Sequence, residues 1–267
     1  MELTACGLTD VGLVRSRNED AILLEPSLNL YAVADGMGGH KGGEFASKIC
    51  LDTLKDYLTR AAQGRAPLVG DLDSAHSPLA NLLGSAVGFA NRAVFEAACA
   101  KPEWRGMGTT LVAVTIADNR VAIAHVGDSR AYLLRNGHFE QLTQDHSWIE
   151  EQVRAGLMNR DEALFAKGRN LLTRAIGQDA TVKVDLDELE LQDGDCLLLC
   201  SDGLYGMVAD EEIAALVSAA ASPQAACREL VACANGRGGR DNISVILLTA
   251  EAGKGLLAGV KRLFTEG

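Results

Sequence analysis

Aspartates stand at the ends of several apolar, strand-like runs of this chain. Three of them follow such a run, namely Asp35 after residues 31–34, Asp128 after 124–127 and Asp202 after 197–201, and Asp241 precedes the run that starts at Ile243. Burying a carboxylate without a partner is costly, so an acid beside a core strand belongs to a turn, a salt bridge or a metal site. These four acids are therefore the first candidates for chemistry.

The number of these acids favours a metal site over separate turns. A single Asp-Gly pair is most often a hairpin turn. Here, however, the runs lead into helical patterns or into Ser-Arg, and few Lys or Arg residues are placed to pair with the acids. A set of oxygen ligands suits a hard, octahedral cation. The pattern predicts a site for Mg²⁺ or Mn²⁺.

Spacing excludes other kinds of site. The histidines, at 40, 76, 125, 138 and 146, show no HExxH or other paired spacing, which excludes the zinc hydrolases, and no GxSxG elbow marks a serine hydrolase. His125 lies in a strand pattern and is predicted to be a core residue with satisfied polar atoms. The stretch 36–43 fits neither GxGxxG nor GxxxxGK. We interpret it as backbone that approaches something closely, with a carbonyl free to coordinate.

Short strands and two helices must position the first of these acids. β-type runs span 3–8, 21–25 and 30–34. Two helical patterns follow, around 46–58 and 79–97, each with apolar residues every three or four positions, and the stretch 63–77 between them is typical of a loop. Each helix would lay an apolar stripe on a sheet.

The second half of the chain is mainly β-type with two further helices. Runs at 109–117, 121–126 and 131–134 are so closely spaced that we expect antiparallel neighbours. Ser147 to Glu150 has the form of a capping box, and the helix it opens would end at Gly156. β-type runs at 181–191, 195–200 and 243–248, with two helices between 210 and 235, complete the pattern.

Composition indicates one globular domain. Apolar residues make up 48% and charged residues 23% of 267, unlike a disordered chain, and no repeat or linker divides the sequence. The net charge of −11, without any Lys/Arg run, argues against nucleic acid as a partner. We expect no membrane contact and a cytoplasmic location, because no leader-like or spanning segment is seen and the seven cysteines have the pattern of reduced thiols.

Seven short motifs stand in a fixed order along nearly the whole chain. They are Arg15-Ser-Arg-Asn-Glu-Asp20, Val33-Ala-Asp-Gly-Met-Gly-Gly-His40, Met107-Gly-Thr-Thr110, His125-Val-Gly-Asp-Ser-Arg130, Leu142-Thr-Gln-Asp-His146, Cys200-Ser-Asp-Gly-Leu204 and Gly238-Gly-Arg-Asp-Asn242. In this order the motifs resemble those of the metal-dependent protein phosphatases of the PPM, or protein phosphatase 2C, family, in its compact bacterial form. No single motif would suffice.

The resemblance implies an α+β fold, a four-layer α-β-β-α sandwich with two central antiparallel β-sheets flanked by helix pairs. A single catalytic domain would cover residues 1–252. Within it, residues of about 146–170 would form a mobile flap beside the active site, and 253–267 would be a short helical tail. We expect a monomer.

The same resemblance implies two catalytic Mn²⁺ or Mg²⁺ ions. Asp35 would bridge the two ions, Asp202 and Asp241 would complete the shell of the first, and the backbone carbonyl of Gly36 would serve the second. Asp128 with Asp202 resembles a third, weaker metal site of the bacterial members.

Two further residues take roles in catalysis by resemblance. Asp20, with Glu19 beside it, resembles the acid that orients a metal-bound water without binding the metal. Arg15 would bind the phosphate of the substrate in bidentate fashion, and the alternative for Arg15 is a surface ion pair. The general acid stays unassigned: Met37 stands where animal members have a histidine, and His40 or a metal-bound water is a candidate.

These roles imply hydrolysis of phosphoserine and phosphothreonine in other proteins. The enzyme would thereby reverse the action of a separate Ser/Thr kinase in bacterial signalling. Two divalent ions roughly 3.5 to 4 Å apart lower the pKa of a shared water, neutralise the phosphoryl oxygens and hold attack in line. Two alternatives stay open: a catalytically silent relative that binds a kinase or phosphopeptide, and a narrow phosphatase that acts on one phosphorylated regulator.

Overall fold

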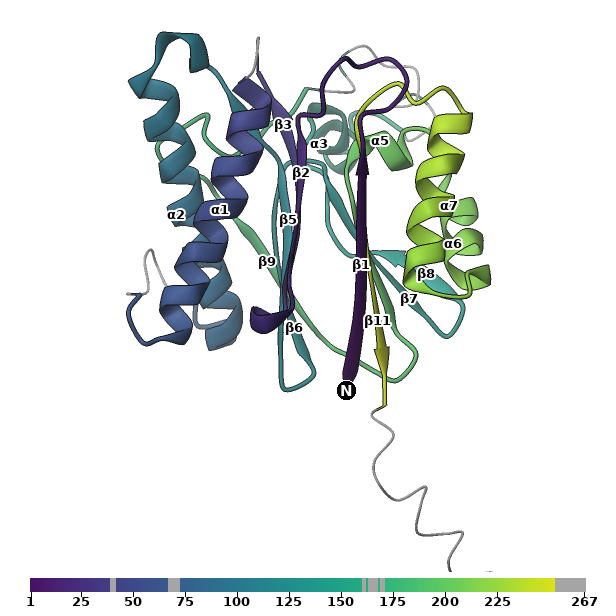
Figure 1. Ribbon diagram of the computed structural model, residues 1–267. Helices are drawn as coiled ribbons and strands as arrows, with labels where there is room; N and C mark the ends of the chain where they lie inside the picture. Colours follow the sequence, from purple (N-terminus) through teal and green to yellow (C-terminus); the bar gives the residue numbers. More distant parts are fainter. Residues whose placement is uncertain (39–41, 67–72, 160–161, 163–167, 169–170, 253–267) are drawn as a thin grey trace, which may run out of the picture.

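Two antiparallel sheets lie face to face between two layers of helices in the computed structural model (Figure 1), which describes residues 1–38, 42–66, 73–159, 162, 168 and 171–252. The first sheet has the order β1 (Glu2–Asp10), β11 (Ile243–Glu251), β10 (Cys196–Cys200), β7 (Arg130–Arg135), β8 (His138–Gln141). The second has the order β2 (Asp20–Glu25), β3 (Leu30–Met37), β5 (Leu111–Ala117), β6 (Arg120–Val126), β9 (Asp185–Glu190), and β4 (Gly108–Thr109) pairs with the end of β3. The predicted four-layer α+β fold is confirmed.

A pair of long helices covers the outer face of each sheet. Helices α1 (Gly42–Ala62) and α2 (Pro78–Ala100) cover the β3 sheet, and α6 (Asp210–Ala219) and α7 (Pro223–Gly236) cover the β11 sheet. Two short helices, α3 (Trp148–Arg154) and α5 (Asp202–Tyr205), lie near one edge of the sandwich, and single 3-10 turns occupy Pro26–Leu28 and Pro102–Trp104. The four helical patterns seen in the sequence are thus confirmed.

Side-chain oxygens and prolines fix where several helices begin. Ser77, Ser147 and Ser222 each accept a hydrogen bond from a backbone N–H of the first turn, which satisfies a donor that has no partner inside the helix. A proline follows the capping serine in α2 and in α7, where its missing N–H costs nothing. The cap predicted at Ser147 is confirmed.

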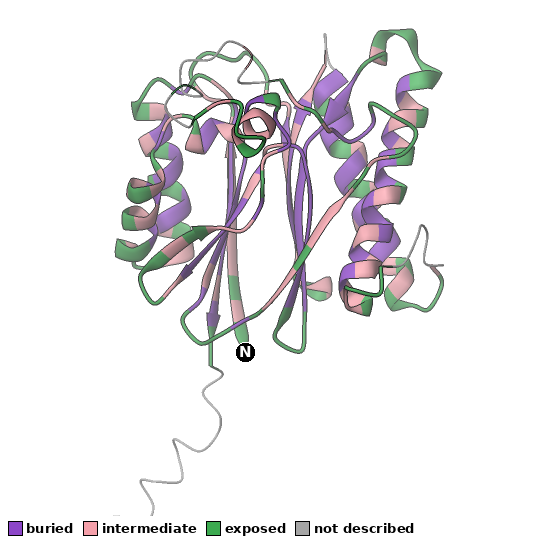
Figure 2. Ribbon diagram, turned by 180° about the vertical axis from the view of Figure 1, so that it is seen from behind, coloured by how far each residue is buried: buried purple, intermediate pink, exposed green. Residues whose placement is uncertain are grey.

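The two-residue period of the strands divides the core into three layers (Figure 2). In β3, Leu30, Ala32 and Ala34 face the helices, whereas Tyr31 and Val33 face the other sheet. By the same alternation Asp35 points into the space between the sheets. In β2, Ile22 and Leu24 face that space as well, so Asp20 shares the orientation of Asp35.

Some expected boundaries were wrong. The strand expected over 181–191 is confined to Asp185–Glu190, and β8 and α5 have no counterpart in the sequence-based expectations. Helix α5 is a single turn and β8 is four residues long, so neither produces a hydrophobic period that a sequence pattern can reveal.

The expectation that β6 and β7 are antiparallel neighbours was wrong. Strand β6 pairs with β5 and β9, whereas β7 pairs with β10 and β8 in the other sheet. The chain crosses between the sheets over residues 127–129, where Gly127 has φ +107, a conformation that favours glycine. Antiparallel pairing was expected because the spacing is short, but the crossover puts Asp128 between the two sheets.

His125 is a core residue, as predicted, but its polar atoms are not satisfied. Its side chain lies between the sheets at the end of β6, and neither ring nitrogen makes a hydrogen bond of normal geometry to the described residues. The ring instead packs against His146, with the centroids 4.6 Å apart. Burial lowers the pKa of His125 to about 3, so the ring is neutral at physiological pH.

No helix among the described residues is both long enough and apolar enough to cross a membrane. The tail expected over 253–267, most of the second half of the expected flap, and His40 lie outside the described residues.

Candidate metal centre

Antiparallel pairing brings the candidate acids to one edge of the sandwich. Strands β3 and β6 run in the same direction, because each is antiparallel to β5, so Asp35, near the end of β3, and Asp128, just after β6, lie at the same edge. The end of β10 and the start of β11 also meet, because these strands are antiparallel neighbours. Asp202, just after β10, and Asp241, just before β11, therefore lie close together.

Asp20 is placed opposite Asp35 by register. The two residues are cross-strand partners in β2 and β3, and both face the other sheet. Cross-strand pairs of like charge are destabilising unless something compensates. The sequence alone does not fix a register, so this pairing is information that the structure adds.

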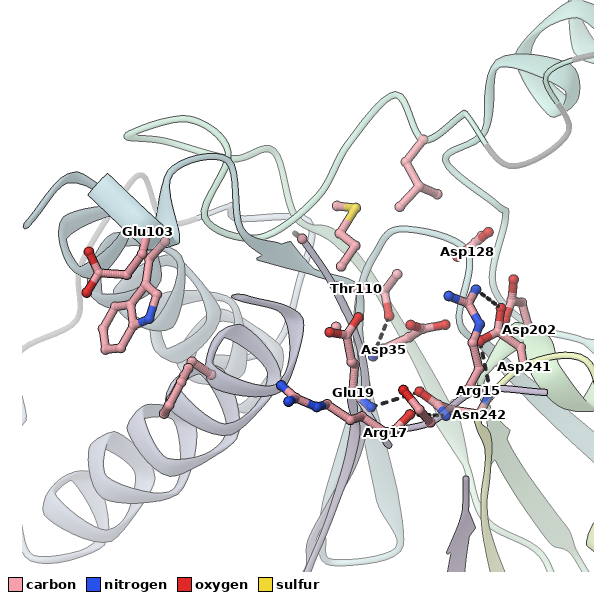
Figure 3. Close-up of a pocket in the computed structure, with 17 residues that line it drawn as sticks. Arg15, Arg17, Glu19, Asp35, Glu103, Thr110, Asp128, Asp202, Asp241 and Asn242 are labelled. Atoms are coloured by element: carbon pink, nitrogen blue, oxygen red, sulfur yellow. Dashed lines mark hydrogen bonds and ion pairs between the residues drawn. The ribbon is translucent and has the colours of Figure 1, made fainter. Parts of the chain in front are cut away.

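These acids line one side of a cavity of about 870 Å³ (Figure 3). Its charged lining residues are Arg15, Arg17, Glu19, Asp35, Glu103, Asp128, Asp202 and Asp241. Figure 3 shows Asp35, Asp128, Asp202 and Asp241 around a common space, with Glu103 at the far side. We call the part of the cavity around these four aspartates the acidic end. Asp20 lies beneath it, buried.

Backbone hydrogen bonds hold the end of β3 in place. The Asp35 N–H donates to the Thr110 hydroxyl at 3.0 Å, and the Asp35 carbonyl accepts from the Thr110 N–H at 2.8 Å and from the Thr109 hydroxyl at 2.9 Å. The Thr110 hydroxyl also lies 2.7 Å from the Ser129 hydroxyl. Because its backbone is fixed on both sides, the Asp35 side chain projects into the cavity from a rigid position.

Burial and mutual repulsion raise the pKa of these carboxyls. The pKa of Asp20 rises to about 6 and that of Asp128 to about 7, in each case mainly through burial and further through the charge of Asp202. The pKa of Asp35 lies well above its ordinary value, because the group is surrounded by protein and faces Asp20, Asp202 and Asp128. Burial and Asp241 also raise the pKa of Asp202. A cation would relieve this repulsion.

Two buried oxygens test whether the site fits a cation. Asp20 Oδ2 accepts a hydrogen bond of 2.7 Å from the Ser201 hydroxyl, but Asp20 Oδ1 and Asp202 Oδ1 have no hydrogen-bond partner in the described part of the chain. Buried polar atoms are normally paired, so each of these needs an explanation such as an ion or a water. The donors are oxygens, which suits Mg²⁺ or Mn²⁺. The residues present fit such an ion.

The acids are gathered but not yet arranged as a closed coordination shell. No three His, Cys, Asp or Glu side chains within the described ranges already surround one point as ligands would. Carboxylates repel one another without a cation between them. Hard ions of this kind also take waters and backbone carbonyls as ligands, so few carboxylates are needed at each ion.

Arg15 forms an ion pair with one of the candidate ligands. Its guanidinium donates to Asp241 Oδ2 at 2.6 Å, and the Arg15 side chain is 54% exposed at the mouth of the cavity. The surface ion pair considered from the sequence is therefore present. The same position, exposed and beside the acids, also lets Arg15 meet an incoming anion.

Glycines allow the backbone to approach closely around the acids. A Cβ on Gly36 would overlap the carbonyls of Gly43 and Glu19, and a Cβ on Gly203 would overlap the carbonyl of Asn242. The close approach expected for the 36–43 stretch is thus observed at Gly36. The contact at Gly203 holds the start of α5 against the start of β11, which brings Asp202 near Asp241.

Asn242 was quoted in a motif but its role was missed. It is buried, its side-chain oxygen accepts from the Glu19 N–H at 2.8 Å, and its amide donates to the carbonyls of Val11 and Arg17 at 3.0 and 2.9 Å. These three bonds fix the loop between β1 and β2 that carries Arg15. A single asparagine after an aspartate gives no sequence signal for such a role.

A second supporting group lies on the other side of Asp128. The Tyr205 hydroxyl donates to the Asp128 carbonyl at 2.9 Å, and the Arg130 guanidinium lies 3.6 Å from the centre of the Tyr205 ring. Asp145 holds Arg130 through hydrogen bonds of 2.9 and 2.7 Å. The sequence could not reveal this group, because its members come from β7, α5 and the segment before α3.

Comparisons with known proteins show the family of this chain. A family model for protein phosphatase 2C matches residues 14–243. The serine/threonine phosphatase stp of Listeria welshimeri is 37% identical over 243 residues, which cover 90% of this chain and 93% of that protein. This chain therefore belongs to the protein phosphatase 2C family.

Solved structures agree with this assignment. The serine/threonine phosphatase PstP/Ppp of Mycobacterium tuberculosis matches with a TM-score of 0.82 and 35% identity, covering 94% of this chain and 99% of that one. The catalytic domain of the phosphatase PstP, solved with two manganese ions, matches with a TM-score of 0.80 and 34% identity, covering 94% and 99%. The predicted family resemblance is confirmed.

Proposed function

We propose that this chain removes phosphate from phosphoserine and phosphothreonine in proteins, using two Mn²⁺ or Mg²⁺ ions held at the acidic end. The observation that supports this most directly is the convergence of four aspartates on one cavity above a buried fifth, with two buried carboxylate oxygens unpartnered. The relatives support the reaction class, because they are named serine/threonine phosphatases and one was solved with two manganese ions.

The acids and one backbone carbonyl would share the ions between them. Asp35 would hold both ions, Asp202 and Asp241 would hold the first, and the Gly36 carbonyl would hold the second. Asp128 and Asp202 would hold a third ion more weakly. Burial and the neighbouring carboxylates raise the pKa of Asp35 and Asp202, which supports a cation at this place.

The bound ions would activate a water for attack on phosphorus and neutralise the phosphoryl oxygens. Asp20 would accept a hydrogen bond from that water through its buried Oδ1, which has no partner among the described residues. The water oxygen bonds to phosphorus as the bond to the serine or threonine oxygen breaks. The leaving oxygen takes up a proton, and the products are the free hydroxyl and inorganic phosphate.

Arg15 binds the phosphoryl group by exchanging partners. Its guanidinium pairs with Asp241 in the structure. When Asp241 binds an ion, its charge is compensated and Arg15 is free to turn its fork of donors to the phosphate. Met37 lines the cavity and offers no proton, so the general acid stays open between His40 and water on the ions.

The wider setting is also part of the proposal. The enzyme would act in the cytoplasm as a monomer, reverse the action of a separate Ser/Thr kinase, and use residues of about 146–170 as a flap within a 1–252 domain. The seven free cysteines support a reducing compartment.

Turnover of a phosphothreonine peptide by the purified protein tests the proposal. We expect hydrolysis with Mn²⁺ or Mg²⁺, none with EDTA, and much slower hydrolysis of a matched phosphotyrosine peptide. Binding of the phosphopeptide without turnover under every metal condition would favour the silent relative instead. Turnover of only one phosphorylated regulator among many would favour the narrow phosphatase.

A further inference from the structure

The cavity extends beyond what phosphate hydrolysis needs. At about 870 Å³ it lies within the range of ~300–1,000 Å³ that encloses a drug-sized ligand. The acidic end occupies one side, and the lining continues to Phe45 on α1 and Trp104 in the turn before β4. Neither aromatic side chain can take part in phosphoryl transfer. We call the part of the cavity lined by Phe45 and Trp104 the aromatic end.

The two rings are held in fixed positions. Their centroids lie 4.7 Å apart with the planes tilted by 33°, and both rings pack against the core between the β3 sheet and its helices. The Lys101 ammonium lies 3.6 Å from the centre of the Trp104 ring, which adds a cation–π contact. The rings are only partly buried, so a rigid apolar surface stays open toward the cavity.

Charged groups continue along the same path. Arg17 and Glu103 also line the cavity, and Figure 3 shows Arg15 turned toward Asp202 and Asp241 while Arg17 points away from them, toward the side where Glu103 lies. A polar rim around a fixed apolar centre is the usual anatomy of a site that binds a protein segment.

We propose that the aromatic end binds a large apolar or aromatic side chain of the phosphoprotein, a few residues along the chain from the phosphorylated residue. The cavity is continuous, so a substrate whose phosphate lies at the acidic end must place its neighbouring residues along the lining. Trp104 and Phe45 are then specificity-determining residues. This inference rests on the proposed function.

The occupant follows from the chemistry of the surface. Stacking against an aromatic pair favours another ring or a bulky aliphatic group. A small aryl phosphate carries its ring directly on the phosphate oxygen, at the acidic end, and has no side chain that extends along the lining to the aromatic end. The subsite therefore predicts discrimination among phosphopeptides that is absent with a small substrate.

A set of phosphothreonine peptides tests this. Each peptide has glycine and alanine on both sides, and one phenylalanine is placed in turn at each flanking position; p-nitrophenyl phosphate is the small substrate. With the wild-type enzyme and Mn²⁺, we expect phenylalanine at one position, or at two neighbouring ones, to raise kcat/KM about tenfold. Trp104→Ala should abolish that preference and leave kcat/KM for p-nitrophenyl phosphate unchanged.

Phe89→Ala is a matched control. Phe89 is 44% exposed and, like Phe45 and Trp104, contacts another ring, that of Tyr57, but it does not line the cavity. This variant should keep the preference. If Trp104→Ala does not fold, Phe45→Leu provides the second test, since leucine keeps most of the packing volume while removing the ring.

A failure of the proposed subsite can be distinguished from a failure of the proposed function. Equal hydrolysis of all phosphopeptides by the wild type, or a preference that survives in both cavity variants, would overturn the subsite and leave the proposed function intact. No hydrolysis of any phosphopeptide would overturn both. A dimer in solution that Trp104→Ala converts to monomers would assign the rings to contact between two copies and overturn the proposal.

Discussion

At the scale of single residues, the acidic end is a set of carboxyls that are unfavourable together until a cation joins them. Asp20 and Asp35 are cross-strand neighbours, and Asp202 raises the pKa of both. The sequence revealed the residue types and their positions beside strands. It could not reveal the Asp20 to Asp35 register or the unpartnered oxygens, because these depend on how distant strands meet.

Removing one of these carboxylates should affect activity and stability in opposite directions. We expect Asp35→Asn or Asp241→Asn to lower metal-dependent kcat by more than about 100-fold, because losing even a group that only supports a ligand costs ~10–100-fold. For Asp35→Asn, the metal-free protein should have a higher Tm, because a repelled buried charge is gone. Steady-state kinetics and thermal unfolding measure the two effects. Activity near that of the wild type in either variant would contradict the metal assignment.

The raised pKa values also predict how stability depends on pH. The pKa of an aspartate in an unfolded chain is ~3.9, but burial raises the pKa of Asp20 to about 6 and that of Asp128 to about 7 in the folded protein. The folded state therefore binds more protons, and its stability falls as the pH rises from about 4 through 7. An ion replaces those protons, so we expect the increase in Tm caused by Mn²⁺ to grow between pH 5 and 8.

Comparing Tm with and without Mn²⁺ at each pH isolates this effect. The lowered pKa values of His125 and His146 act in the opposite direction, because these rings are held neutral and their stabilisation is lost as the pH falls. Their contribution is the same with and without the ion and cancels in the difference. A Tm increase that is constant over this pH range would contradict the prediction.

Arg15 should act on substrate binding more than on the chemical step. Arg15→Ala removes a donor to the phosphate and leaves the proposed metal ligands in place, so we expect a higher KM for a phosphopeptide with a smaller change in kcat. Its ion pair with Asp241 is largely exposed, so the effect on stability should be under about 1 kcal/mol. An unchanged KM would leave Arg15 with only its ion pair.

At the scale of elements, the connections between strands position the site more than the strands themselves. The turn over 127–129 crosses from one sheet to the other, and Tyr205, Arg130 and Asp145 support it. Hydrophobic periods predicted the long helices and most strands. They missed α5 and misplaced β7, because one turn of helix and a short crossover carry no period.

Two partly buried ion pairs allow a test of this support. Arg130→Ala leaves Asp145 without its cation, and Arg135→Ala does the same to Asp195, whose side chain is 1% exposed; we expect each to cost about 3 kcal/mol of unfolding free energy. Only the Arg130 variant should also weaken Mn²⁺ binding, because only Arg130 contacts Tyr205 beside Asp128. Calorimetric titration measures this, and equal affinity in both variants would count against the support role.

At the scale of the whole molecule, the cavity forms where strand ends of both sheets meet at one edge of the sandwich. Alternating apolar residues of the two sheets pack against each other in the middle layer, and the same alternation continues to Asp20 and Asp35 at the edge. This is why the candidate acids could be predicted from patterns of strand and acid, whereas the four-layer fold was predicted from the resemblance of the seven motifs to those of the family. The aromatic end could not, since Phe45 and Trp104 are far apart in sequence and each alone has the pattern of a core residue.

The most direct test of the account is hydrolysis of a phosphothreonine peptide by the wild type and by Asp35→Asn, each measured with EDTA and with Mn²⁺. The account predicts turnover only for the wild type with Mn²⁺, and a folded but inactive variant. Turnover by the wild type in EDTA, or by the variant at the wild-type rate, would show that the acidic end does not carry the reaction.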